Sequence, residues 1–431
     1  MIVKKKQYQV ITLRNFRNVE QIKVYLTEEQ KRHIEVVGNV LPFKINNYVI
    51  DELIDWTNIP NDAIFQLTFP QKGMLSPLNY KTMEDALSAD LSKSDLKKIA
   101  EGIRYQLNPN PSGQEKNIAK VDDLDLRGIQ HKYQETALFF PSSGQTCHAY
   151  CSFCFRWSQF VGMEDLKFAM KESELLINYL EKTPSITDVI FTGGDPMIMS
   201  TQKLASYIEP LIEQKPGNLQ NIRLGTKALG FWPYKFLTDK DVDDTLRLFE
   251  KVIKNGFHLT LMAHFSHPRE LQTDAVQKAI KRILSIGVQI RTQSPILNHI
   301  NNDADAWAAM WKKQVQLGLI PYYMFIARDT GAKDYFAIPL ERALAVYNNA
   351  YQRVSGLART VKGPSMSTDY GKIEVLGINE INNEKVFTLR FIQARNPAWV
   401  KEPFFAKYDP EATWISDLKP AFGGEKFFFQ Q

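Results

Sequence analysis

Hydrophobic positions in the first 125 residues recur with the spacing of amphipathic helices. Thr27-x-x-Gln30 has the form of a capping box, and a second helical repeat runs through residues 96–103 behind a possible serine cap. Two prolines and a polar stretch up to Asp125 then interrupt the pattern. The sequence therefore predicts a helical N-terminal extension over residues 1–125.

After residue 136 the pattern changes to short apolar runs that alternate with helical segments. The runs have the length of buried strands, and helical spacing from Leu166 to Leu180 predicts the first helix between them. The six runs are Ala137–Phe140, Val189–Thr192, Ile222–Thr226, Leu259–His264, Val288–Thr292 and Tyr322–Ile326. Repeated β-then-α units favour a parallel sheet with right-handed crossovers. We therefore predict an α/β protein in which residues 126–355 form a partial (β/α)6 TIM-like barrel.

The C-terminal residues 356–431 predict a small α/β segment with an aromatic tail. Ile373–Leu376 and Val386–Phe391 have the pattern of short strands, and Phe427-Phe428-Phe429 ends the tail. Aromatic tails pack either on a second subunit or back onto their own domain. The sequence leaves both arrangements open, and with them a homo-oligomeric state.

Composition and charge narrow the class of protein. The 431 residues are 44% hydrophobic and 23% charged, which is ordinary for a globular protein, and the formal net charge of +5 is small for this length. A nucleic-acid partner or an anionic membrane is therefore not expected. Because the first ten residues lack an apolar run and no stretch of about 18 apolar residues follows, we expect a cytoplasmic protein.

The only cysteines of the chain lie within eight residues, as C-x3-C-x2-C at Cys147, Cys151 and Cys154. Three thiols leave one unpaired in any disulfide scheme, and a zinc site generally takes four ligands. A [4Fe–4S] cluster held by three cysteines suits the spacing better, because one iron then remains open to a small molecule. The spacing therefore favours an iron–sulfur cluster over zinc or a disulfide.

Other polar residues follow the later predicted strands. Gly193-Gly194-Asp195-Pro196 follows the second strand, and His264, Gln293 and Arg328 stand at the ends of later ones. Since the carboxyl ends of parallel strands meet at one edge of the sheet, these side chains are expected to converge there with the cysteine loop. Two adjacent glycines allow the backbone to approach a ligand closely.

These motifs, in this order, resemble the lysine 2,3-aminomutase family of radical S-adenosylmethionine enzymes. The resemblance covers roughly residues 60–375, and the order is more specific than any single motif. The matching stretches are IPNDAIFQLTFPQ at 59–71, HKY at 131–133, C-x3-C-x2-C-x-R ending at Arg156, FTGGDPMIMS at 191–200, IRLGT at 222–226, HFSHP at 264–268, TQSPILNHINND at 292–303, PYY at 321–323 and DYGK at 369–372.

The resemblance implies three cofactors and the residues that bind them. Cys147, Cys151 and Cys154 would hold a [4Fe–4S] cluster whose open iron binds S-adenosylmethionine. The residues expected to bind this cofactor or pyridoxal 5′-phosphate are Lys132, Tyr133, Gly193, Gly194, Asp195, Thr226, His264, Gln293 and Lys372. Lys372 would be the catalytic lysine that carries pyridoxal phosphate. The implied reaction moves an amino group between adjacent carbons by way of a 5′-deoxyadenosyl radical.

Departures from the family pattern bear on the substrate. Arg156 matches the family arginine that pairs with the substrate α-carboxylate. Lysine-specific members hold the distal ammonium with two aspartates, whereas the aligned positions here are Arg328 and Ser365. A guanidinium would repel the lysine side chain, so the resemblance favours an acidic amino acid such as glutamate.

Further departures leave other activities open. The family arginine for the cofactor phosphate is missing from Gln134-Glu135-Thr136, and SMSTDY at 365–370 replaces a glycine-rich run. The alternatives are a radical enzyme that abstracts hydrogen without pyridoxal phosphate, a non-catalytic iron–sulfur protein, and a zinc-bound structural protein. For an enzyme of either kind the expected partners are an amino-acid substrate and an electron donor such as a flavodoxin or ferredoxin.

Overall fold

A twelve-stranded sheet organises the computed structural model, which describes residues 6–430. Neighbouring strands in the sheet are also neighbours in the chain, from β3 at one edge to β14 at the other. The central six strands are parallel: β5 (Thr136–Phe139), β6 (Asp188–Phe191), β7 (Asn221–Thr226), β8 (His258–His264), β9 (Gln289–Ile296) and β10 (Ile320–Ile326). The predicted succession of six parallel strands is confirmed.

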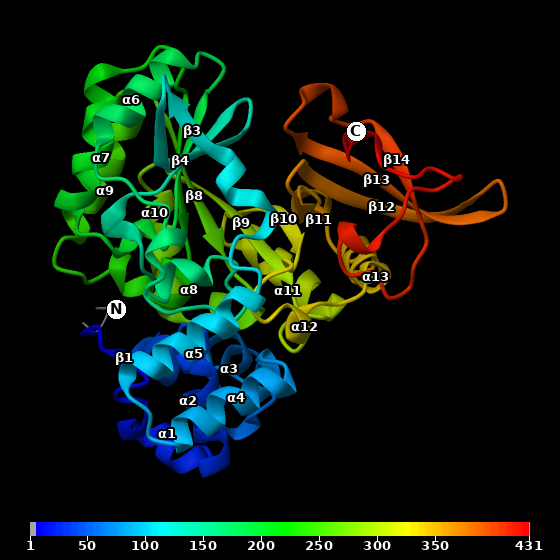
Figure 1. Ribbon diagram of the computed structural model, residues 1–431. Helices are drawn as coiled ribbons and strands as arrows, with labels where there is room; N and C mark the ends of the chain where they lie inside the picture. The colour runs from blue at the N-terminus through cyan, green and yellow to red at the C-terminus, as the bar shows by residue number, and fades with distance from the viewer. Residues whose placement is uncertain (1–5, 431) are drawn as a thin grey trace.

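Helices between the strands cover one face of this parallel sheet (Figure 1). They are α6 (Ser173–Lys182), α7 (Thr201–Gln214), α9 (Val242–Lys254), α10 (Asp274–Leu284), α11 (Ala304–Gln316) and α13 (Leu340–Gln352). The short helices α8 (Ala228–Phe231) and α12 (Lys333–Phe336) lie in the loops after β7 and β10, next to the N-terminal helices (Figure 1). Along β7 buried residues alternate with partly exposed ones, and Arg223 belongs to the exposed set. Strand residues that face the helices are thus sealed in the core, whereas those on the other face remain accessible to a ligand.

The strands at the two ends of the sheet pair antiparallel, except that the first strand after β10 is parallel to it, and the two ends curve toward each other. β3 (Ile118–Val121) and β4 (Leu124–Tyr133) pair beside β5, and β11 (Lys362–Ser367), β12 (Gly371–Ile381), β13 (Glu384–Ala394) and β14 (Pro403–Lys407) continue beyond β10. β12 and β4 are far apart in strand order, yet Nζ of Lys372 lies 5.1 Å from the centre of the Tyr133 ring. This approach requires a curved sheet, as in a partial barrel.

The N-terminal helices gather at one end of the sheet (blue to cyan in Figure 1). They are α1 (Glu20–Tyr25), α2 (Glu28–Val40), α3 (Ala63–Thr68), α4 (Pro77–Ser88) and α5 (Lys93–Gln106), joined by a small sheet of β1 (Val10–Thr12) and β2 (Lys44–Asn46). The capping box of Thr27 and Gln30 is present at the start of α2. None of the helices in the described part of the chain is both long and apolar enough to cross a lipid bilayer.

The first crossover helix is shorter than the sequence predicts. α6 begins at Ser173, so the prediction that helical structure starts near Leu166 is wrong. The backbone N–H of Met170 donates a 2.9 Å hydrogen bond to the carbonyl oxygen of Phe140, and Pro141 and Met170 form an isolated β-bridge. Hydrogen bonds to a distant strand end therefore override the local helical spacing.

The C-terminal segment consists of strands and short 3-10 turns, and its aromatic tail folds back onto them. The ring of Phe429 lies 4.9 Å from that of Tyr370 and 5.2 Å from that of Phe391. Of the two arrangements left open by the sequence, the structure therefore contains the fold-back. Tyr370 lies two residues before Lys372, so the tail supports the strand that carries this lysine.

Candidate active site

The three cysteines lie in the loop between β5 and α6, and the N-terminal layer holds this loop. The backbone N–H of Tyr150 donates to the carbonyl oxygen of Lys44 at 2.8 Å, and that of Ser152 donates to Leu67 at 2.9 Å. The hydroxyl of Ser152 donates to the carbonyl oxygen of Gln66 at 2.7 Å. The sequence stretch at 59–71 thus serves as a floor for the cysteine loop.

Cys147, Cys151 and Cys154 are half-buried free thiols. Burial raises the pKa of all three, that of Cys154 to about 11, so a bound iron cluster would have to displace their protons. Within residues 6–430 no three His, Cys, Asp or Glu side chains converge closely enough to hold a single metal ion. A [4Fe–4S] cluster would bind each thiolate through a different iron, so it would not require the three thiols to converge on one point.

Gly193 and Gly194 pack directly on the cysteine loop. A Cβ atom at Gly194 would lie 2.4 Å from both the backbone nitrogen and oxygen of Thr146, next to Cys147. Gly193 has φ of +124°, and a Cβ there would lie 2.2 Å from Nε2 of Gln145. The two glycines therefore allow a close approach of two loops that any larger residue would separate.

Asp195 ties the ends of β6 and β7 together. Its buried carboxylate accepts hydrogen bonds from the hydroxyl of Thr226 at 2.7 and 2.9 Å, from the N–H of Lys227 at 2.8 Å and from the N–H of Met197 at 2.9 Å. Burial raises the pKa of Asp195, and these donors oppose that shift. Asp195 thus fixes the strand ends beside the glycine pair.

His264, at the end of β8, presents an unpaired nitrogen next to the cysteine loop. Its ring makes an edge contact with Phe153 at 5.6 Å, and its buried Nε2 has no hydrogen-bond partner in residues 6–430. Burial holds its pKa well below the usual value, so the imidazole is neutral. Gln293 lies opposite His264 in the β8–β9 register and is half-buried. An unsatisfied buried polar atom at this position fits a bound polar ligand.

Lys227 and Glu270 form a buried ion pair close to Cys151 that the sequence did not reveal. Nζ of Lys227 lies 2.6 Å from Oε2 of Glu270, and their side chains are 9% and 0% exposed. Glu270 also accepts from the N–H groups of Ser266 and His267. The sequence feature that could have pointed to Lys227 is its place directly after Thr226, at the end of a predicted strand.

Arg156 and Arg328 bring two guanidinium groups to the same aromatic ring. Cζ of Arg156 lies 5.0 Å and Cζ of Arg328 lies 4.2 Å from the centre of Phe155. Burial lowers the pKa of both arginines, that of Arg156 to about 9. Asp329 and Asp369 lie beyond ion-pair distance of Arg328, and their negative charges partly oppose the lowering of its pKa. No carboxylate in residues 6–430 forms an ion pair with either guanidinium.

The side chains of Ser365 and Arg328 form hydrogen bonds to different groups. Its buried hydroxyl donates to the carbonyl oxygen of Met324 at 3.4 Å, whereas Nη2 of Arg328 donates to the hydroxyl of Ser367 at 3.0 Å. In the β11–β12 register Ser367 lies opposite Lys372. The SMSTDY stretch therefore connects the guanidinium of Arg328 with the strand position of Lys372.

Lys372 lies between two tyrosine rings on the inner face of the curved sheet. Its Nζ is 4.6 Å from the ring centre of Tyr323 and 5.1 Å from that of Tyr133. Nζ donates a 2.6 Å hydrogen bond to Oε1 of Gln393, which no sequence motif indicated because it arises from the β12–β13 register. Burial lowers the pKa of Lys372 to about 7. With a pKa near 7 about half of the lysine is neutral at pH 7, and the neutral amine is the form that acts as a nucleophile.

Lys132 adds a further cation beside Tyr133. Burial, together with Arg328 and Arg395, lowers its pKa to about 6, and its Nζ lies 5.5 Å from the ring centre of Tyr133. Gln134 and Glu135, the next residues along the chain, are exposed and lie outside this group. Lys132 is therefore the cation that β4 contributes.

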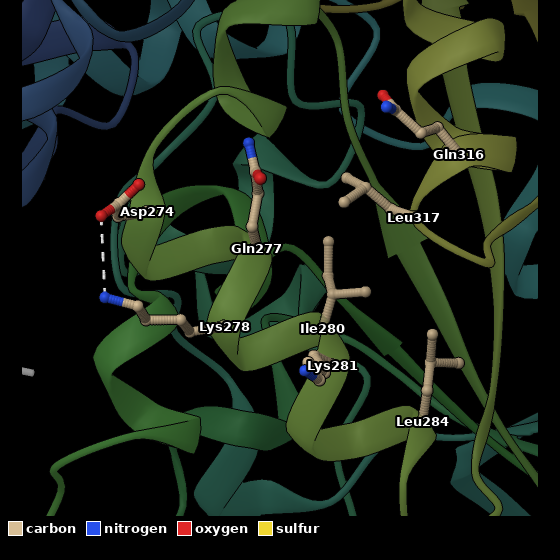
Figure 2. Close-up of a pocket in the computed structure, with 8 residues that line it drawn as sticks. All are labelled: Asp274, Gln277, Lys278, Ile280, Lys281, Leu284, Gln316 and Leu317. Carbon is tan, nitrogen blue, oxygen red and sulfur yellow. Dashed lines mark ion pairs between the residues drawn. The ribbon is translucent and has the colours of Figure 1, made fainter. Parts of the chain in front are cut away.

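Two cavities lie outside this group of residues. One, of about 410 Å³, is a groove between α10 and α11 lined by residues such as Gln277, Ile280 and Leu317 (Figure 2). The other, of about 860 Å³, lies between the N-terminal layer and the loop after β10 and includes Asp329. Neither contains a predicted site residue, and the chemically distinctive side chains are those along the inner face of the sheet.

Comparison with known proteins identifies the family. The chain is 32% identical over 393 residues to a protein of Aquifex aeolicus (strain VF5) that is provisionally named as an L-lysine 2,3-aminomutase, and the match covers 91% of each chain. This chain belongs to the lysine 2,3-aminomutase family. The L-lysine 2,3-aminomutase of Haemophilus influenzae is 26% identical over 335 residues, covering 74% of this family member and 91% of that one.

Two further comparisons add little detail to the family assignment. No family model matches the chain. A radical SAM methyltransferase from Sphaerobacter thermophilus covers 66% of this family member and 84% of its own chain, with 13% identity and a TM-score of 0.38. Membership of the aminomutase family itself implies an enzyme with a [4Fe–4S] cluster and S-adenosylmethionine.

Proposed function

We propose that this family member is a 2,3-aminomutase that uses S-adenosylmethionine and pyridoxal phosphate and acts on an acidic amino acid. The observation that carries the proposal is that Arg156 and Arg328 bring two guanidiniums without carboxylate partners to one aromatic ring, while Arg328 also donates to Ser367, the residue opposite Lys372 in the β11–β12 register. Unpaired buried cations are costly, and a dianionic ligand would compensate them.

Cys147, Cys151 and Cys154 would hold the cluster, and Gly193, Gly194, Thr226, His264 and Gln293 would line the place of S-adenosylmethionine. The glycine pair lets the loop after β6 pack against the cysteine loop, and the free Nε2 of His264 is available to a bound ligand. When bound, these groups supply a carbon radical that removes a hydrogen atom from the substrate. The protein itself holds the site together: Asp195 fixes the ends of β6 and β7, and the backbone of Lys44 and Leu67 binds the cysteine loop.

The pyridoxal phosphate assignment rests on the surroundings of Lys372. About half of its amine is neutral at pH 7, and the rings of Tyr133 and Tyr323 on either side offer faces for an aromatic cofactor ring to stack on. Lys132 would take the phosphate as a point charge. Pyridoxal phosphate supplies an electron sink for the amine that migrates, while Lys372 holds the cofactor and Gln393 holds Lys372.

Substrate selection would depend on charge at both ends. Arg156 presents a buried Nη1 without a hydrogen-bond partner in residues 6–430, as expected of a donor reserved for a carboxylate. Arg328 would pair with a distal carboxylate, and it would repel the ammonium of lysine by Coulomb interaction in a partly desolvated site.

Anaerobic turnover tests this proposal. The wild-type enzyme with reductant should convert L-glutamate or a related acidic amino acid to the β-amino acid faster than it converts L-lysine. Arg328→Asp should reverse this preference by at least about tenfold, since it exchanges attraction for repulsion. Faster conversion of L-lysine than of every acidic amino acid tested would refute the acidic substrate.

A second candidate is a radical enzyme that works without pyridoxal phosphate. It is favoured by the residues after Tyr133, because Gln134 and Glu135 are exposed and offer no positive charge for a cofactor phosphate. The visible spectrum of anaerobically purified protein, followed by borohydride reduction and peptide mapping, separates the two. A pyridoxyl label on Lys372 supports the aminomutase, and its absence with intact S-adenosylmethionine cleavage supports the second candidate.

A further inference from the structure

The ring of Phe155 contacts both unpaired guanidiniums, and this residue belongs to no assigned site. Its ring centre is 4.2 Å from Cζ of Arg328 and 5.0 Å from Cζ of Arg156. Cations are attracted to the electron-rich face of an aromatic ring, and this attraction grows when the site is desolvated. One ring therefore offers both arginines a favourable contact although their charges repel each other.

Each guanidinium is also held on a second side. Arg156 lies 4.4 Å from the centre of the Phe140 ring, and Arg328 donates to the hydroxyl of Ser367 at 3.0 Å. The Phe155 ring is the element that these two sets of contacts share. Its position thus sets how far apart the two guanidiniums lie.

The loops that carry these residues are fastened together next to the ring. Nε1 of Trp157 donates to the hydroxyl of Thr330 at 2.9 Å, which joins the cysteine loop to the loop after β10. A Cβ at Gly331 would lie only 3.0 Å from Cδ1 of Trp157, so the two loops are already in close contact. Phe155 is therefore held on a rigid support rather than on a mobile segment.

We propose that Phe155 is a positioning residue that fixes the spacing of Arg156 and Arg328 and thereby makes the site selective for dicarboxylates. This inference rests on the proposed acidic substrate and adds the residue that determines which substrate length the two arginines select. An aliphatic side chain at position 155 would remove the shared contact and let the two long arginine side chains adopt other rotamers. Binding of a ligand that contacts both arginines would then be weaker.

Binding of two amine-free probes to the reconstituted holoenzyme tests the proposal. Glutarate carries two carboxylates and butyrate carries one, so their ratio of dissociation constants reports on simultaneous use of both arginines. The wild type should bind glutarate at least about tenfold more tightly, since one additional charged contact has this magnitude. Phe155→Leu and Phe155→Met should each reduce this preference about fivefold or more, whereas Phe155→Tyr, which keeps the ring, should retain it.

Phe153→Leu is the matched control, because Phe153 lies in the same loop but packs on His264 and Phe336 rather than on an arginine. It should leave the glutarate preference unchanged, and iron content should confirm an intact cluster loop in every variant. Retention of the preference in either apolar variant at 155 overturns the proposal. Absence of the preference in the wild type also overturns it, and in that case the acidic substrate itself fails.

Discussion

Nζ of Lys372 donates a 2.6 Å hydrogen bond to Oε1 of Gln393, its cross-strand partner between β12 and β13. A neutral amide acceptor satisfies this lysine without adding a negative charge. The pKa of Lys372 therefore stays low, at about 7, with burial as the main cause. A carboxylate in the same place would stabilise the protonated amine instead.

Gln393→Glu should raise the pKa of Lys372 by at least about one unit, because an opposite charge at hydrogen-bond distance has an effect of this size. Competitive acetylation of the cofactor-free protein between pH 6 and 10, followed by peptide mass spectrometry, measures the neutral fraction of this lysine. The reactivity midpoint should move upward in Gln393→Glu but not in Gln393→Met. An unchanged midpoint in the glutamate variant would show that Gln393 does not control Lys372.

Gly194→Ala should disrupt the cysteine loop, since the added Cβ would lie 2.4 Å from the Thr146 backbone. Overpacking of this kind costs about 1–3 kcal/mol, and here the movement would be passed on to Cys147. Production of 5′-deoxyadenosine should fall at least about tenfold. Gly217→Ala is the control, because nothing lies within 4 Å of its built Cβ. Equal activity of the two variants would contradict a tight loop contact.

Lys227→Met should destabilise the protein by about 3–5 kcal/mol, because it leaves Glu270 charged and buried. Removing both charges in Lys227→Met with Glu270→Gln should cost less than the sum of the single changes. Urea unfolding of the four proteins gives the coupling energy. The exposed pair Lys81–Asp85 is the control, and Lys81→Met should change stability by less than about 1 kcal/mol. Strict additivity would mean that the buried pair is not coupled.

The order of strands was readable from the sequence because each strand is a short apolar run followed by a helical segment. For the same reason His264 and Arg328 could be placed at strand ends, where the structure has His264 and from which Arg328 is two residues away, whereas Gln293 lies inside β9 because that strand continues to Ile296. The residue types themselves indicated the chemistry of the cysteine loop. These features depend on residues that are close together in the sequence, so the pattern within one segment is enough to predict them.

What the sequence could not predict depends on contacts between distant segments. Gln393 faces Lys372 through strand register, Phe155 meets Arg328 because two loops are joined at Trp157 and Thr330, and the residues before Ser173 follow a strand end instead of a helix. Register and loop docking are set by the packing of the whole sheet, so no periodicity in one segment reveals them.

Lys132 should bind anions more tightly as pH falls. Its pKa is lowered to about 6, chiefly by burial and then by Arg328 and Arg395, so it is mostly neutral at pH 8 in the absence of a ligand. An anion stabilises the protonated form, which raises this pKa and couples binding to proton uptake. Sulfate is a clean probe, because it does not titrate in this range, and its affinity should fall at least about tenfold between pH 6 and pH 8.

Lys132→Arg separates this lysine from its neighbours. A guanidinium remains charged throughout the range, so the variant should bind sulfate with a distinctly flatter pH dependence, while Lys132→Met should bind it weakly at every pH. Calorimetric titrations at several pH values provide both measurements. If the wild type shows no pH dependence, or if Lys132→Arg is as steep as the wild type, the anion site does not involve Lys132, and the phosphate of pyridoxal phosphate must be held by other cations.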